Sequence, residues 1–159
     1  MGRIDSYASV PYADEYLGSL IGTSVWKDMD SQDKERALVT ATLHIDALDS
    51  YGGGFRGKKA APDQPLIFPR CPDTEVPENI KRACCHEALA LLEQLSDPGA
   101  SKRTGAIRQG VTAITIGDVS ESYAKSSEVS NGLKGYLLSD MAISLISPYM
   151  AVKGVYPIV

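Results

Sequence analysis

Two overlapping patterns in one glycine-rich stretch could bind phosphate. Residues 52–57 match the G-x-G-x-x-G fingerprint of dinucleotide-binding loops, and residues 52–58 match a P-loop up to its last position, where Lys59 replaces Ser or Thr. Both motifs bind phosphate at amides that converge on a helix N-terminus, so both need a strand before the loop and a helix directly after it. Here a predicted helix precedes the glycines, and two prolines between residues 58 and 65 oppose a helix there. We therefore interpret the stretch as a surface turn.

The cysteines and histidines could in principle hold a metal ion or serve in catalysis. Cys84, Cys85 and His86 are consecutive, so on a helix they point about 100° apart and cannot converge on one ion. With the distant Cys71 they form an odd set that suits reduced thiols in a packed core. His44 lies beside an apolar helical stripe, and no G-x-S-x-G or H-E-x-x-H sequence occurs. The sequence predicts no catalytic residue, no cofactor and no metal ion, and we expect a protein that is not an enzyme.

The charge balance argues against nucleic acid as the primary partner. The formal net charge is −4 and the pI is about 5.1, whereas proteins that hold a phosphate backbone usually carry a basic surface. Arg56, Lys58 and Lys59 could touch DNA with Phe55 as a stacking ring, but the acidic total favours a solvated loop. No apolar run approaches the roughly 20 residues that cross a bilayer, and the first residues lack a signal peptide's apolar stretch. We expect a soluble protein, made in a cytosol, with no membrane partner.

Helical periodicity dominates the rest of the chain and predicts one domain over residues 1–159, with a helical core at 11–97 and 133–149. The four helices are expected from Pro11 to Gly22, from Asp30 or Ser31 to before Gly52, from Pro77 to Asp97, and from Leu133 to Pro148. The third has the clearest buried stripe: Ile80, Cys84, Ala88, Leu91 and Leu95.

Two segments depart from the helical pattern. Residues 111–124 alternate around Gly117-Asp118, which predicts a β-hairpin, and residues 151–159 form an apolar tail that contains a proline. A long ordered loop with an apolar hook at residues 66–70 precedes the third helix. The predicted fold class is therefore mainly α, a small bundle of three to four helices with one protruding β-hairpin and an extended apolar C-terminal tail.

The order of these pieces resembles a known family. The matching segments are residues 6–10 (Ser-Tyr-Ala-Ser-Val), 13–16, Trp26, 33–42, 45–46, the hook within 64–70, and 76–83 at the start of the third helix. Residues 110–123 and 145–149 are similar to the family's hairpin and to the end of its last helix. The family is that of the small helical head–tail connector, or adaptor, proteins of tailed bacteriophages, some of which carry a DnaT-like label.

The resemblance implies a structural subunit of the phage neck. Such a subunit would form a homo-oligomeric ring of about twelve copies that joins the portal to the tail and lines the DNA channel. Its partners would be the portal protein and a downstream neck or tail-completion protein, with DNA only as passing cargo, and its location would be the virion. The expected interface residues are Phe68, Arg70, Val111, Ile114, Ile116, Val119, Tyr123, Val152, Val155, Tyr156, Ile158 and Val159. The alternative is a DnaT-like accessory protein of replication that binds single-stranded DNA, which predicts a basic groove with interleaved aromatic rings.

Overall fold

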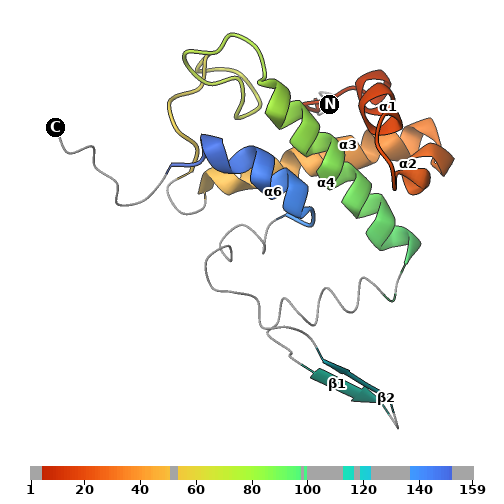
Figure 1. Ribbon diagram of the computed structural model, residues 1–159. Helices are drawn as coiled ribbons and strands as arrows, with labels where there is room; N and C mark the ends of the chain where they lie inside the picture. The colour runs from red at the N-terminus through yellow and green to blue at the C-terminus, as the bar shows by residue number, and fades with distance from the viewer. Residues whose placement is uncertain are drawn as a thin grey trace.

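The fold is mainly helical, as the sequence predicts (Figure 1). The computed structural model describes residues 5–50, 54–97, 99, 113–116, 119–122 and 137–151. Its α-helices are α1 (Val10–Gly18), α2 (Ser24–Asp28), α3 (Ser31–Ala47), α4 (Glu78–Ser96) and α6 (Asp140–Ile146), with 3-10 turns at Leu48–Ser50 and Ser147–Tyr149. None of the helices in this described part is long and apolar enough to cross a membrane.

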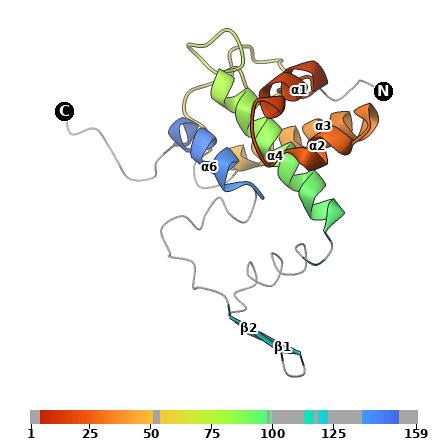
Figure 2. The same ribbon diagram turned by 45° about the vertical axis from the view of Figure 1, so that its right-hand side comes forward.

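Helix α4 is the central element of the bundle. It crosses α3, and it lies between α6 on one side and α1 with α2 on the other (Figure 2). Ile80, Cys84 and Ala88 of α4 are fully buried, and so are Leu38 and Ile45 of α3. The third helix predicted from the sequence therefore packs on the second.

Side-chain caps set where three of the helices begin. Ser9 accepts a hydrogen bond from the Tyr12 amide at the start of α1, and Asp30 accepts one from the Asp33 amide at the start of α3. Ser139 caps α6 in the same way. A side-chain oxygen at this position satisfies an amide that has no partner within the helix. The expected start of the second helix at Asp30 or Ser31 is thereby confirmed.

Four expectations about the helices were wrong in detail. The first helix ends at Gly18 and not at Gly22, because the chain leaves the helix at Ser19. The last helix begins at Asp140 and not at Leu133, because Ser139 caps it there; Leu137 is buried ahead of it, and Leu133 lies outside the described residues. Leu91 is only partly buried and Leu95 is 76% exposed, whereas Leu92 between them is buried. The short helix α2 was not predicted at all.

Trp26 explains why α2 is present. Its side chain is buried, and its indole Nε1 donates a hydrogen bond to Asp14 Oδ1 at 2.8 Å. Lys34 Nζ lies 3.0 Å from the same oxygen and 5.4 Å from the centre of the indole ring. The indole thus joins α1, α2 and α3 at one end of the bundle.

Strands β1 (Ala113–Ile116) and β2 (Val119–Ser122) pair antiparallel, with Ile116 opposite Val119. They fall within the predicted hairpin at 111–124, but its protrusion from the bundle stays a prediction because the segments on both sides are outside the described residues. The tail beyond Ala151 also lies outside them. The chain just before the tail is fixed: Ala151 N donates to Gly54 O, and Arg56 N donates to Tyr149 O, each at 2.8 Å.

Candidate functional site

The hook at residues 66–70 folds into the protein's own core. Phe68 is 3% exposed, and its ring contacts those of Tyr7, Phe55 and Tyr149 edge-on, with centroids 4.8–5.9 Å apart. The ring of Phe68 is therefore part of the core. Phe68 was also predicted to lie in an interface. Its ring contacts its own chain and does not lie at the surface, so a contact with the portal or a neighbouring subunit stays a prediction.

Arg70 fastens the hook to the glycine-rich turn. Its guanidinium donates hydrogen bonds to the carbonyl oxygens of Phe55, Arg56 and Gly57, and Nη1 lies 3.7 Å from Asp49 Oδ1. Arg70 thus has a charged partner within its own chain. Because the planar guanidinium donates hydrogen bonds to several carbonyl oxygens at once, it positions residues 55–57 as a unit.

The glycine-rich turn has a steric explanation. Gly54 has a φ of +72°, and a Cβ at this position would clash with the Asp49 carbonyl oxygen. Glycine is needed where the backbone adopts this conformation and approaches another chain segment closely. Gly54, the middle glycine of the G-x-G-x-x-G match, is therefore explained by backbone packing against the 3-10 turn after α3.

Replacing Arg70 with lysine tests this arrangement. A lysine keeps the charge but cannot reach several carbonyl oxygens at once, so we expect the free energy of unfolding to fall by about 1–2 kcal/mol in urea titrations. The matched control is Arg36→Lys, in an exposed pair with Asp33, where a change within about 0.5 kcal/mol is expected. Equal losses in the two variants would contradict a special role for Arg70.

Two of the three cysteines are packing residues, as expected. Cys84 and Cys85 are fully buried, and burial raises the pKa of the Cys84 thiol to about 11. The expectation is wrong for Cys71, which is exposed. Within the described part of the chain, no three His, Cys, Asp or Glu side chains are grouped so that they could hold a metal ion.

Glu87 is the one fully buried carboxylate of α4, among the residues the structure describes, and sequence reasoning missed it. Its two oxygens accept hydrogen bonds from the amides of Leu138 and Ser139 at 2.9–3.0 Å. His44 Nδ1 of α3 lies 2.9 Å from Oε1, and the His44 side chain is 34% exposed. His44 is thus partly at the helix surface, as predicted, but it also belongs to a junction that ties α6 to α4 and α3.

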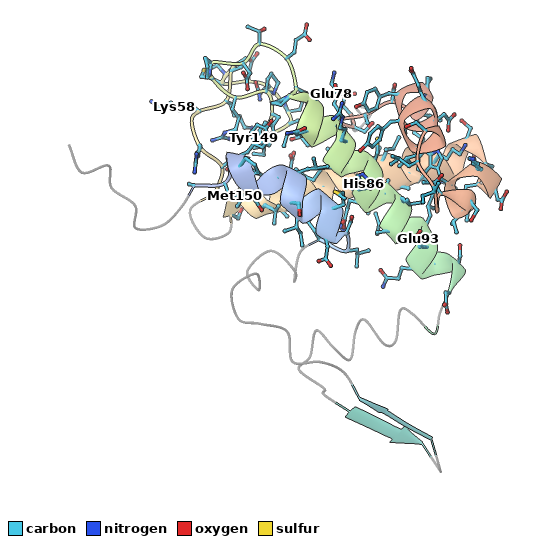
Figure 3. All side chains as sticks on the ribbon, viewed as in Figure 1. Lys58, Glu78, His86, Glu93, Tyr149 and Met150 are labelled. Atoms are coloured by element: carbon cyan, nitrogen blue, oxygen red, sulfur yellow. The ribbon has the colours of Figure 1, made fainter. Side chains whose placement is uncertain are left out.

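A face between α1 and α4 combines aromatic rings with cations. We call this set the α1–α4 face: Tyr12 and Tyr16 from α1, and Lys81, Arg82 and His86 from α4. Lys81 Nζ lies 6.0 Å from the centre of the Tyr12 ring, and the Arg82 guanidinium carbon lies 5.6 Å from that of Tyr16. The Tyr16 hydroxyl lies 3.0 Å from His86 Nε2. In Figure 3, Glu78 at the start of α4 and His86 further along it mark the length of helix involved.

An open groove of about 370 Å³ lies where α3 begins and α4 ends. Its lining is mostly apolar and consists of Met29, Asp33, Arg36, Ala37, Thr40, Leu91, Leu92, Leu95 and Ser96. Leu91 and Leu95, two members of the predicted core stripe, lie here. The groove was not expected from sequence, because helical spacing alone does not show where a neighbouring helix stops covering a stripe.

The other expected interface residues are not brought together by the described structure. Ile114, Ile116 and Val119 lie in β1 and β2, whose side chains are not described. The rest lie outside the described residues: Val111, Tyr123, Val152, Val155, Tyr156, Ile158 and Val159.

One family model matches almost the whole chain. It is described as "Putative DnaT-like ssDNA binding protein", and the match covers residues 2–153. The chain belongs to this DnaT-like family. The match spans every helix and both strands given above. No curated protein and no solved structure matches the chain.

Membership of the DnaT-like family agrees with the DnaT-like label that some of the resembling connector proteins carry. It gives no support for a phage neck, because the family's description names single-stranded DNA and no virion component. The two functions weighed from the sequence therefore both remain proposals, and the two surfaces just described favour different ones.

Proposed function

We propose that the protein is a non-enzymatic assembly subunit of a tailed-phage neck, forming a homo-oligomeric ring between portal and tail. The observation that carries this proposal is the apolar groove between α3 and α4. Leu95 is among the most exposed large apolar side chains of the described residues, and Leu91 and Met29 lie beside it. Apolar surface gathered in this way is typical of a protein–protein contact.

A groove of this kind suits the geometry of a ring. Closed rings use head-to-tail contacts, in which one surface of each subunit meets a different surface of the next. The Asp33–Arg36 pair at 3.1 Å places polar groups beside the apolar lining. A polar rim around an apolar centre is the usual composition of such an interface. The order of sequence segments shared with phage connectors supports the same proposal.

The test is assembly of the full chain, alone and with a portal protein, followed by native mass spectrometry and electron microscopy. Wild-type protein is expected to form rings in at least one condition, and Leu95→Asp to remain folded but monomeric, because a carboxylate would be desolvated in the groove. Met141→Asp, which changes an exposed apolar residue of α6 outside the groove, is the control and should still assemble. A wild-type chain that stays monomeric in both conditions, or a Leu95→Asp variant that assembles normally, contradicts the proposal.

The second candidate function is binding of single-stranded DNA, and the description of the DnaT-like family supports it directly. The net charge of −4 opposes a strong general attraction to phosphate. The α1–α4 face nevertheless offers the combination of cations and aromatic rings that single-strand binding uses. Titration of a labelled single strand at two salt concentrations decides whether the protein binds it at all.

A further inference from the structure

We infer that single-stranded DNA binds at the α1–α4 face, with phosphates against Lys81 and Arg82 and bases against the rings of Tyr12 and Tyr16. This inference rests on the second candidate function and assigns it a site. It goes beyond the neck proposal, which needs no nucleic-acid contact by this helix pair.

The helices arrange the rings and the polar side chains in two rows. Tyr12 and Tyr16 are four residues apart on α1, and Arg82 and His86 are four apart on α4, so each pair occupies one side of its helix. Lys81 is next to Arg82 and lies near the Tyr12 ring. The tyrosine rings are nearly parallel, with an interplanar angle of 20° and centroids 6.2 Å apart. Both rings are partly exposed. Rings held in one orientation beside cations provide a platform for successive bases and their backbone.

Arg82 combines a buried Nε with an accessible remainder of its side chain. The Nε makes no hydrogen bond among the described residues and is ion-paired with Glu78 Oε1 at 3.5 Å, whereas the side chain as a whole is 43% exposed. A guanidinium binds phosphate with two parallel hydrogen bonds, so the exposed part of Arg82 offers a contact for the DNA backbone.

The charge of the face comes from its two permanent cations. Burial lowers the pKa of His86 and so disfavours its charged form, and burial raises the pKa of Tyr16. Glu78 offsets part of the positive charge. With few phosphates neutralised, the binding should be moderate in strength, with a shallow salt dependence.

The glycine-rich loop is the other cationic region, and its contacts make it less suitable. Phe55, the ring proposed for stacking there, is buried against Phe68. Arg56 Nε donates to Met150 O, and Lys59 Nζ donates to Gln64 O. Two of the three cations of the loop are therefore held by carbonyl oxygens; Lys58 is exposed, but among the described residues 54–59 the loop offers no accessible ring.

The experiment compares two double charge reversals that change the net charge equally. Lys81→Glu with Arg82→Glu alters the face, and Lys58→Glu with Lys59→Glu alters the loop. Binding of the full chain to a labelled oligothymidylate of about 20 nucleotides is followed by fluorescence anisotropy, with an unlabelled duplex as competitor. Loss of the face cations should weaken binding by about tenfold or more and make the slope of log affinity against log salt shallower by about 1.4, which corresponds to two phosphates.

A third variant, Tyr12→Leu with Tyr16→Leu, keeps the charge and removes the stacking rings. It should weaken binding by about tenfold, with little change in the salt slope. Thermal melting by circular dichroism confirms that each variant is folded. If the Arg82 variant does not fold, Lys81→Glu alone is compared with Lys58→Glu.

The possible outcomes test separately whether the protein binds single-stranded DNA and whether it does so at the α1–α4 face. Binding by the wild type that survives both changes to the face overturns the site but leaves the second candidate standing. Equal losses in the face and loop reversals also overturn it, since they indicate general electrostatics. No binding of the single strand by the wild type overturns the second candidate itself.

Discussion

Replacing Glu87 with alanine is expected to lower the free energy of unfolding by about 3–5 kcal/mol, the range found when one partner of a buried polar junction is removed. The substitution leaves the amides of Leu138 and Ser139 without their acceptor and opens a space inside the bundle. It also removes the contact with His44. Because these amides lead directly into α6, we expect that helix to detach before the rest of the bundle unfolds.

Urea titration followed by circular dichroism measures the stability change, and hydrogen exchange of the α6 amides measures the local effect. Glu87→Gln keeps the volume and one acceptor, so a smaller loss of about 1–3 kcal/mol is expected. Glu93→Ala, on an exposed part of the same helix, is the control for helix propensity and surface charge. If Glu87→Ala and Glu93→Ala have the same stability, Glu87 does not hold the junction.

Trp26→Ala is the second change with a large expected effect, a loss of about 3–5 kcal/mol. The indole fills the space between α1, α2 and α3, and its removal leaves a cavity together with an Asp14 oxygen that loses its buried donor. Unfolding should be followed by circular dichroism, since Trp26 is the only tryptophan and the variant has no intrinsic tryptophan signal.

Trp26→Phe separates the contribution of the buried ring from that of the hydrogen bond to Asp14. A phenyl ring keeps much of the buried area but cannot donate to Asp14, so the loss should be clearly smaller than for alanine. An alanine variant as stable as the phenylalanine variant would show that the ring is not packed as described.

The long helices could be predicted from sequence because their signals are local. The apolar stripe of residues 80–88 has helical spacing, and Asp30 is a strong capping residue. Helix α2 gave no such signal. It has five residues, fewer than two turns, and Thr23 before it makes no side-chain cap. Its presence depends on Trp26 and on α1 and α3, which are contacts that no local pattern describes.

The missed functional groups share one physical cause. Glu87 follows Ile80 by seven residues and Cys84 by three, which places a carboxylate on the buried side of its helix. That spacing was a usable signal, but its partners are backbone amides 51 and 52 residues away. The α1–α4 face likewise joins side chains about 70 residues apart. Periodicity identifies which side of a helix is buried, whereas the partner across the interface depends on the fold.

The close approach of Gly54 to Asp49 restricts which residues homologous chains can have at this position. Gly57 is constrained too, with a φ of +75° and a hypothetical Cβ only 3.0 Å from Cys71 O. Selection for a compact backbone would therefore keep glycine at both positions in homologues, whatever ligand they bind. A motif search over such sequences would repeatedly find these two glycines of the nucleotide fingerprint, although they record only where two stretches of backbone pass close to each other.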